Sequence, residues 1–380
     1  MSRDKLWHLT TSARWFGGRG RDARLADVTA LPASGPVVSH LLDVAYADGT
    51  AERYHVPLVK SALPGVAEAV DEGLHLWQAF ATGAPGFQLF DDLPRPGAAR
   101  RFTGEQSNTS VFFDNGTMLK VLRRVEPGAD IEAELLEALR GSGVAPELHG
   151  VWSHGDIPLG VLVESLTDPD DGFDLATASA AAGRSFEEHS AALGGALATV
   201  HAQLRSALPT RRLDVGEFAR GALERFEEAA SSVPELERFR AGVTRRFGEL
   251  PTVELVAQRV PGDCHLGQTL LSEGRWRYVD FEGEPIKPVA ERRALDSGLR
   301  DVAGMLRSFD YAAATAGAAP AWIAAARDAF TRGYGPTESQ DLLQLYELDK
   351  AIYEAVYEAR FRPSKLVIPL TGIAALLGEG

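Results

Sequence analysis

The sequence has a single cysteine and very few lysines. Cys264 has no second cysteine to pair with, so an internal disulfide and a disulfide-stapled secreted fold are excluded. Only six of the 39 basic residues are lysine. A lysine inside an apolar strand is therefore conspicuous in this chain.

The sequence also lacks a positive net charge, a long apolar run and an internal repeat. With 39 basic and 53 acidic residues the formal net charge is −14, which argues against a nucleic-acid-binding surface. No apolar run reaches the length of a bilayer crossing, and the N-terminal residues have no signal-peptide core. No fixed-period repeat indicates a solenoid or propeller. We therefore expect a cytoplasmic protein without nucleic-acid or membrane partners.

The composition is that of a globular protein. The chain has 380 residues, of which 45% are apolar and 24% charged, enough for about two or three domains. Segments rich in proline and glycine at residues 81–97 and 168–172 indicate boundaries. We expect an α+β fold with an N-terminal cap (residues 1–98), a small β-rich lobe (residues 99–166) and a large, mostly helical lobe (residues 167–380).

Four pairs of apolar segments are predicted to form β-hairpins. Each pair is joined by a short turn that contains glycine, which tolerates the positive φ of tight hairpin turns. The predicted strands are residues 37–46 with 53–59, 110–113 with 118–122, 148–152 with 159–164, and 268–271 with 276–281.

Helical patterns fill much of the remaining chain. Residues 130–140 carry apolar side chains at helical spacing and are followed by Gly141, which suits a helix C-terminus. Ser185 and Glu188 have the spacing of a capping box at the start of a helix that extends to Leu208. Residues 213–250 and most of the chain after Leu295 are also predicted to be helical.

The spacing of three polar residues indicates phosphoryl transfer. Asp263 is followed five residues later by Gln268, and Asp280 comes after a further predicted hairpin. Transfer of a phosphoryl group from ATP needs one carboxylate that orients the acceptor hydroxyl and accepts its proton. It also needs an amide and a second carboxylate that hold Mg²⁺ against the phosphates. We assign the first role to Asp263 and the second to Gln268 and Asp280.

Residues suited to binding the nucleotide precede this set. Lys120 lies on a predicted strand, from which its ammonium can reach the phosphates of ATP, and either Glu132 or Glu134 on the next helix can pair with it. A polar loop is predicted to lay its backbone N–H groups over the phosphates, and a later strand to pair its backbone with adenine. The loop residues are Ser107, Asn108, Thr109 and Ser110, and the strand residues are Val163 and Glu164.

Three motifs give the chain a resemblance to a known group of kinases. They are residues 262–268 (GDCHLGQ), residues 279–285 (VDFEGEP) and the C-terminal residues 353–360 (YEAVYEAR), which are followed by residues 362–363 and 368–370. The chain resembles aminoglycoside-phosphotransferase-like kinases, and among them bacterial maltokinases and glucosamine kinases. The resemblance implies a bilobal protein-kinase-like fold with an N-terminal cap, ATP and Mg²⁺ as cofactors, and Glu132 as the partner of Lys120.

Residues 258–263, in which Pro261 stands where related kinases usually have histidine, are more similar to glucosamine kinases than to maltokinases. The resemblance therefore implies transfer of the γ-phosphate of ATP to the 6-hydroxyl of glucosamine, an amino sugar. The alternatives are a maltokinase acting on the anomeric hydroxyl of maltose, an aminoglycoside phosphotransferase, and a nucleotide-binding pseudokinase without turnover. The acidic composition, with Glu282 and Glu284 near the motif, favours a cationic acceptor and so does not separate glucosamine from aminoglycosides.

Six further residues are candidate sugar contacts, each with an ordinary structural alternative. They are His265, Glu282, Arg300, Asp301, Tyr353 and Tyr357. His265 is equally suited to a structural hydrogen bond, and Arg300 and Asp301 to capping a helix. The two tyrosines lie four residues apart on one helix face, where core packing is the commoner use. The sequence leaves these alternatives and the oligomeric state open.

Other conspicuous residues are interpreted as structural. The residues His154-Gly155-Asp156 spell a kinase-like motif, but no amide follows at the required spacing, so we predict a turn. Cys264 and its histidine neighbour point apart in an extended loop, so we predict a buried small residue rather than a nucleophile. A zinc site here would lack a second ligand cluster. His201, on an apolar helix face, is predicted to be a core histidine with satisfied hydrogen bonds.

Overall fold

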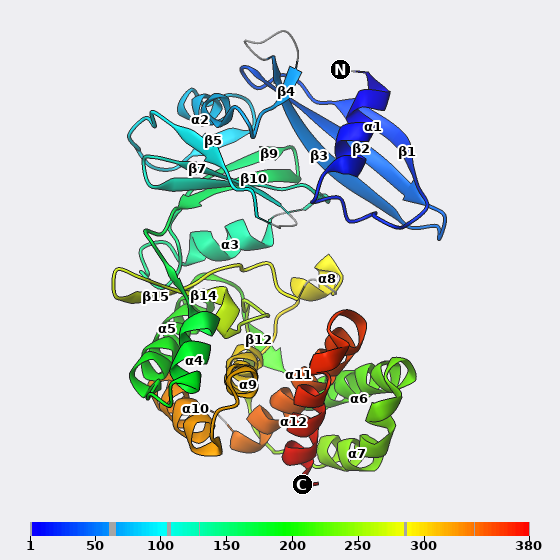
Figure 1. Ribbon diagram of the computed structural model, residues 1–380, viewed down its shortest axis with the longest axis vertical. Helices are drawn as coiled ribbons and strands as arrows, with labels where there is room; N and C mark the ends of the chain where they lie inside the picture. The colour runs from blue at the N-terminus through cyan, green and yellow to red at the C-terminus, as the bar shows by residue number, and fades with distance from the viewer. Residues whose placement is uncertain are drawn as a thin grey trace. The chain divides into compact units, whose positions relative to one another are not determined.

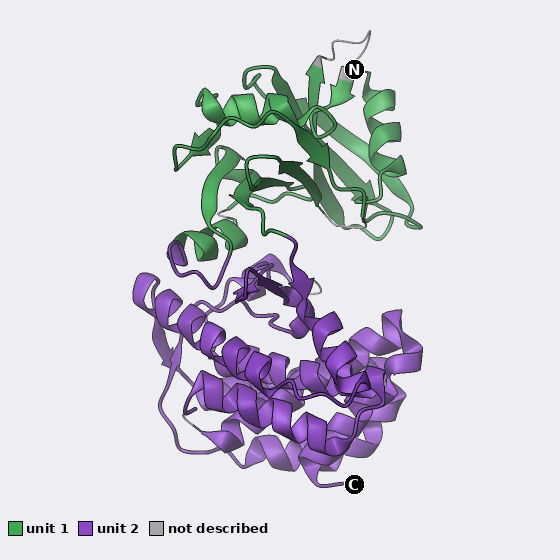
Figure 2. Ribbon diagram, turned by 60° about the vertical axis from the view of Figure 1, so that its left-hand side comes forward, with its two compact units in different colours: residues 1–137, 146–167 green, residues 138–145, 168–380 purple. Residues whose placement is uncertain are grey.

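The computed structural model describes residues 2–60, 66–104, 108–128, 130–284, 287–337 and 339–379. It combines helices and sheets, as the sequence predicts (Figure 1). The chain forms two compact units (Figure 2). The first comprises Met1–Glu137 and Pro146–Thr167, and the second comprises Ala138–Ala145 and Asp168–Gly380.

The first unit begins with helix α1 (Arg3–Ser12) and a four-stranded antiparallel sheet in the order β1-β2-β3-β4. Its strands are β1 (Ala23–Ala30), β2 (Val37–Tyr46), β3 (Ala51–Lys60) and β4 (Val66–Glu68). The predicted first hairpin is confirmed, because β2 and β3 pair from Val37 with Val59 to Ala45 with Ala51. Alternate β2 side chains are buried, and Leu6 of α1 packs with Leu42 and Val44 of β2 in one apolar cluster.

A six-stranded antiparallel sheet completes the first unit, in the order β5-β9-β10-β8-β7-β6. Its strands are β5 (Phe87–Leu89), β6 (Ala99–Arg101), β7 (Thr109–Phe113), β8 (Thr117–Val121), β9 (Leu148–His154) and β10 (Ile157–Glu164), and its helices are α2 (Gly73–Ala81) and α3 (Ile131–Ala138). The second and third predicted hairpins are confirmed. Strand β5 lies before residue 98, in the predicted cap, but it pairs with β9 of the predicted small lobe. The division of this unit into a cap and a lobe at residue 98 stays a prediction.

A buried arginine joins the two sheets of the first unit. Arg123 is fully buried, and its Nη1 lies 2.9 Å from Oε1 of Glu68 at the end of β4. Its Nε donates to Oγ1 of Thr109 on β7 at 2.8 Å, and its carbonyl accepts a hydrogen bond from the N–H of His55 on β3 at 2.7 Å. One guanidinium therefore links strands of both sheets.

We expect Arg123→Met to lower the free energy of unfolding of this unit by about 3 kcal/mol, because the buried Glu68 loses its nearest cation. Arg124→Met is the matched control. Arg124 also pairs with a glutamate, Glu52 at 3.3 Å, but its side chain is 49% exposed, so its loss should cost at most about 1 kcal/mol. Chemical denaturation measures both variants, and equal losses would contradict a special role for the buried pair.

The second unit is mostly helical. Its longer helices are α4 (Gly172–Ala181), α5 (Glu187–Ala207), α6 (Val215–Ser232), α7 (Arg240–Gly248), α9 (Leu299–Ala316), α10 (Pro320–Tyr334), α11 (Gln340–Phe361) and α12 (Val367–Leu377), with the short α8 (Val289–Arg292). The predicted helical stretches at residues 213–250 and after Leu295 are confirmed, with 3₁₀ turns at Pro234–Phe239 and Pro363–Lys365.

Two small sheets lie among these helices. One has the order β11-β14-β15 and the other pairs β12 with β13. The strands are β11 (Asp170–Asp171), β12 (Arg211–Leu213), β13 (Leu255–Ala257), β14 (Thr269–Ser272) and β15 (Arg275–Tyr278). The pairing of β14 with β15 confirms the fourth predicted hairpin.

The predicted capping box at the start of α5 is wrong in its detail. The hydroxyl of Ser185 accepts a hydrogen bond from the N–H of Glu187 at 3.2 Å, two residues away, rather than three. The helix begins at Glu187, so Ser185 lies one position too early to cap it. The predicted end of this helix near Leu208 is confirmed.

Within the described residues, none of the helices combines the length and the hydrophobicity that a bilayer crossing requires.

Candidate active site

In the first unit, the predicted lysine and glutamate are in contact. Lys120 lies on β8, between β10 and β7, and its Nζ donates to Oε2 of Glu132 at 2.8 Å. Asp130 caps helix α3 by accepting a hydrogen bond from the N–H of Ala133 at 2.7 Å, which places Glu132 in the first turn. Of the two candidate glutamates, the structure therefore gives Lys120 the partner that the resemblance implies.

The predicted phosphate loop is described only in part. Ser107 lies outside the described residues. Thr109 and Ser110 are already the first residues of β7 and are both buried. Asn108 Oδ1 accepts a hydrogen bond from the N–H of Arg123 at 3.2 Å, so its side chain is tied to the same buried arginine as Thr109. Phosphate binding by these residues stays a prediction.

The predicted adenine-binding strand is β10, near its C-terminal end. Val163 is 5% exposed and pairs with residues of both neighbouring strands. The N–H of Glu164 donates to the carbonyl of Glu147 at 2.9 Å, so this donor already has a partner within the first unit. Adenine binding at this strand stays a prediction.

In the second unit, helix α9 holds the loop that carries Asp263. The N–H of Gly262 donates to Oδ1 of Asp301 at 2.9 Å, and the N–H of Leu266 donates to Oγ of Ser308 at 2.8 Å. The two helix residues are seven positions apart and so lie on one face of α9. The loop is therefore fixed on both sides of Asp263 by a single helix face.

Close packing and a buried histidine complete this anchor. Gly304 lies between the two anchoring residues of α9, and a Cβ atom there would come within 2.4 Å of the carbonyl oxygen of Cys264. The Asp301 side chain is fully buried, and its Oδ2 lies 3.1 Å from Nε2 of His201, whose Nδ1 lies 2.9 Å from the hydroxyl of Tyr334. His201 is thus a core histidine with both nitrogens satisfied, as predicted. The arrangement favours a structural role for Asp301 over the sugar contact considered from the sequence.

The carboxylate of Asp263 remains partly exposed and contacts a lysine from a distant part of the chain. Its Oδ1 accepts a hydrogen bond from Nζ of Lys350 on α11 at 2.9 Å. The Asp263 side chain is 17% exposed. A carboxylate in this position is held by its neighbour and still accessible to a hydroxyl group, as a general base must be.

The two predicted metal ligands are in contact with each other. Nε2 of Gln268 donates to Oδ2 of Asp280 at 2.8 Å. Asp280 has φ of +62°, a left-handed conformation. Such a conformation costs a residue other than glycine about 1–3 kcal/mol and is concentrated at functional sites. Asp280 follows strand β15, so a residue with this costly backbone conformation supplies the carboxylate that contacts Gln268.

The pair is chemically suited to Mg²⁺. This ion prefers oxygen ligands and usually takes only one or two from the protein, with the others from water and substrate phosphates. In the part of the chain that the structure describes, no group of three or more His, Cys, Asp and Glu residues could hold a metal ion by itself. Gln268 and Asp280 therefore fit a metal that shares its coordination with a nucleotide.

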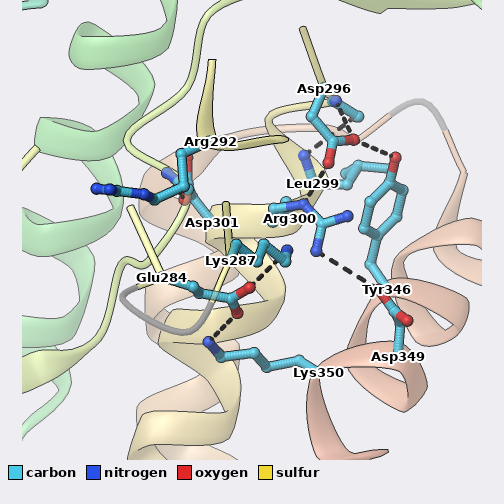
Figure 3. A network of polar contacts seen from close by, with 12 residues as sticks. Glu284, Lys287, Arg292, Asp296, Leu299, Arg300, Asp301, Tyr346, Asp349 and Lys350 are labelled. Carbon is cyan, nitrogen blue, oxygen red and sulfur yellow. Dashed lines mark hydrogen bonds and ion pairs between the residues drawn. The ribbon is translucent and has the colours of Figure 1, made fainter. Parts of the chain in front are cut away.

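Glu284 belongs to a buried ionic cluster with two lysines (Figure 3). Its Oε1 lies 2.6 Å from Nζ of Lys350 and its Oε2 lies 2.5 Å from Nζ of Lys287. Burial alone raises the pKa of Glu284, but the two ammonium groups outweigh it and hold this pKa well below its ordinary value. The two lysines balance the charges of Glu284 and Asp263, so Glu284 adds no net negative field for a sugar amine, contrary to the expectation from the sequence.

Arg300 lies in a neighbouring polar network (Figure 3). It pairs with Asp296, and its Nη1 lies 3.5 Å from Oδ2 of Asp349. The hydroxyl of Tyr346 donates to Oδ1 of Asp296 at 2.8 Å. Burial lowers the pKa of Arg300, but the surrounding carboxylates raise it well above its ordinary value. These contacts favour a structural role for Arg300 over a sugar contact.

The two candidate tyrosines lie on α11 and are both partly buried. The ring of Tyr353 faces Nζ of Lys350, which lies 4.6 Å from the ring centroid. The ring of Tyr357 packs against Phe361, with a centroid distance of 4.9 Å. Sugar stacking on either ring stays a prediction.

The remaining candidate sugar contacts are His265 and Glu282, both partly buried. Burial lowers the pKa of His265 below its ordinary value, which favours the neutral imidazole. The carbonyl oxygen of Glu282 accepts a hydrogen bond from Nη1 of Arg292 at 2.8 Å. A sugar contact by either residue stays a prediction.

The residues interpreted as structural behave as expected. His154-Gly155-Asp156 form the turn between β9 and β10, where Gly155 has φ of +59°. Cys264 is buried and free, and burial raises the pKa of its thiol well above the ordinary value, so it is a poor nucleophile.

The sequence analysis missed Lys350 as a site residue. The available signal was that Lys350 is one of only six lysines in the chain. A single helical lysine is ordinarily a solvated charge, whereas Lys350 is 8% exposed.

Comparison with known proteins places the chain in a family. Residues 10–70 match the maltokinase N-terminal cap domain family. The chain is 30% identical to a glucosamine kinase of Streptacidiphilus jiangxiensis over 382 residues, which covers 87% of each protein. It is 29% identical to a glucosamine kinase of Mycolicibacterium smegmatis over 357 residues, which covers 83% of this chain and 89% of the relative.

Solved structures agree with this assignment. A glucosamine kinase in complex with glucosamine, ADP and inorganic phosphate has a TM-score of 0.72 and 25% identity, and the match covers 97% of this chain and 98% of the other. A second glucosamine kinase structure (crystal form B) has a TM-score of 0.71. These matches confirm the kinase-like fold, and the chain belongs to the glucosamine kinase family.

Proposed function

We propose that this protein is an ATP-dependent phosphotransferase that converts glucosamine and ATP into glucosamine 6-phosphate and ADP. The observation that carries the proposal is the contact between Gln268 and Asp280 beside a loop that presents the partly exposed carboxylate of Asp263. The names of the relatives support the choice of sugar, since one of them was solved with glucosamine and ADP. A cytoplasmic location, where ATP is abundant, is part of the proposal.

In the proposed reaction, Asp263 orients the 6-hydroxyl of the sugar and accepts its proton. The sugar oxygen forms a bond to the γ-phosphorus of ATP as the bond from that phosphorus to the bridging oxygen breaks, and ADP leaves. Lys120, held by Glu132, pairs with the phosphates of the nucleotide. Gln268 and Asp280 would hold Mg²⁺, which when bound offsets the negative charge of the phosphates.

A maltokinase is the second candidate function. It is favoured by one specific observation, the match of residues 10–70 to the maltokinase N-terminal cap domain. The match covers only the N-terminal part of the chain, and not Asp263 or the Gln268–Asp280 pair, so it carries less weight for the acceptor than the relatives that match along most of the chain.

An ADP-release assay with a panel of acceptors tests the proposal. We expect the highest kcat/KM with glucosamine. N-acetylglucosamine, which lacks the ammonium group, should be poorer by about 10-fold to 10²-fold, the usual loss of one hydrogen bond to a charged group. Glucose, maltose and an aminoglycoside complete the panel. Turnover with maltose but not glucosamine would establish the second candidate, and the absence of turnover with every sugar would contradict both.

A further inference from the structure

Lys350 is a buried lysine placed between two carboxylates of the second unit. It lies on α11 and is 8% exposed. Its Nζ lies 2.9 Å from Oδ1 of Asp263 and 2.6 Å from Oε1 of Glu284, toward which it points in Figure 3. The ring of Tyr353 lies beside the same ammonium. Burying a lysine costs free energy, because the ammonium loses solvation and the side chain loses conformational freedom. We therefore look for a function that this position serves.

The contact between Lys350 and Asp263 engages only one oxygen of the carboxylate. Among the described residues, Asp263 makes no other hydrogen bond or ion pair. Rotation about the bond that carries a carboxylate is broad unless a partner fixes it. The ion pair through Oδ1 therefore sets the orientation of the group and leaves Oδ2 for a hydroxyl.

The charges around Lys350 keep it protonated. Burial alone lowers its pKa, but Asp263 and Glu284 outweigh this effect and raise the pKa of Lys350 well above the ordinary value. The ammonium therefore has no lone pair with which to accept the proton of a sugar hydroxyl. What it can do is hold its neighbours in place.

We propose that Lys350 is a positioning residue for catalysis, which holds Oδ1 of Asp263 so that Oδ2 meets the acceptor hydroxyl. Glu284 fixes the lysine in turn through Oε1, whereas Lys287 contacts the other oxygen of Glu284 and has no part in holding Asp263. The inference rests on the proposed function, because it takes Asp263 as the group that accepts the proton. The proposed role of Lys350 differs from simple charge balance. Of the two lysines, only Lys350 contacts Asp263 in the described part of the chain.

The test compares two lysine-to-methionine variants of the full chain. Lys350→Met keeps the apolar stem and removes the ammonium, and we expect kcat with glucosamine to fall by about 10²-fold, as for a catalytic group displaced by about 1 Å. The KM for ATP should stay within about twofold, because the lost contact acts on the proton acceptor and not on nucleotide binding. Lys287→Met is the matched control, since it removes the same charge from the same Glu284, and it should leave kcat within about threefold.

Chemical rescue separates positioning from a general loss of structure. Lys350→Ala leaves space for a small molecule, so added propylammonium should restore part of kcat. Propanol has a similar size but no charge, and it should restore nothing. Equal responses to the two compounds would overturn the proposal, because a positioning ion pair requires the charge.

Crystal structures of the wild-type protein and of Lys350→Met decide the question without relying on turnover. We expect the carboxylate of Asp263 to leave its position in the variant or to occupy more than one rotamer. An unmoved Asp263 would overturn the proposal, whether or not kcat falls. An absence of turnover by the wild-type protein would instead contradict the proposed function, and the two structures would still decide the role of Lys350.

Discussion

Replacing Asp263 by asparagine should lower kcat with glucosamine by about 10²-fold to 10⁴-fold, the range for removal of a general base. The amide has nearly the same shape as the carboxylate but cannot accept the proton of the sugar hydroxyl. Because the change leaves Lys120 and Glu132 untouched, binding of ATP should be nearly unchanged. Steady-state kinetics and calorimetric titration with nucleotide measure the two quantities separately.

Asp156→Asn is the matched control for this variant. Asp156 belongs to the exposed turn between β9 and β10, in the sequence that spells a kinase-like motif. The Asp156→Asn variant should retain the kcat of the wild-type protein. Retained activity in Asp263→Asn, or a comparable loss in Asp156→Asn, would contradict the assignment of the base.

Asp280→Asn should lower kcat by about 10²-fold or more, because a metal that stabilises transition-state charge contributes several kcal/mol and each 1.36 kcal/mol is tenfold in rate. The concentration of Mg²⁺ needed for half-maximal activity should also rise, since a neutral amide is a weaker ligand than a carboxylate. Asparagine tolerates the left-handed backbone of this position, so the variant tests the charge rather than the fold. A titration of activity with Mg²⁺ gives both readouts.

Glu273→Asn provides the control for this position. Glu273 also has positive φ, 50°, in the turn between β14 and β15, and its side chain is exposed. This variant should keep both kcat and the Mg²⁺ requirement of the wild-type protein. An unchanged Mg²⁺ requirement in Asp280→Asn would contradict its role as a metal ligand.

Local features of the fold were predictable because local sequence determines them. All four hairpins are present, since a glycine at positive φ between two alternating apolar segments strongly favours a tight turn. The pairing of Lys120 with a glutamate of the next helix was also anticipated, because a strand and the following helix are close in the sequence, while the choice of Glu132 came from the resemblance to known kinases. The prediction of a capping box at Ser185 was wrong, since a cap depends on which residue first adopts helical geometry.

The residues around Asp263 were less predictable because distant segments supply them. Lys350 is 87 residues from Asp263 along the chain, and Asp301 is 39 residues from Gly262. No periodicity or turn signal connects such pairs. Burial also changes the effect of a charged side chain on a ligand. Glu284 was expected to attract a cationic sugar, whereas in the structure its charge is offset by Lys350 and Lys287.

The identity of the product tests the central claim most directly. Phosphorus NMR of the reaction of the wild-type protein with ATP and glucosamine distinguishes the possible positions by coupling to the hydrogens on the phosphorylated carbon. A phosphate on the 6-hydroxyl couples to a CH₂ group and gives a triplet, and this is the result that we predict, together with one ADP per phosphorylated sugar. A doublet from a phosphate on the anomeric carbon, or no new sugar phosphate at all, would contradict the account.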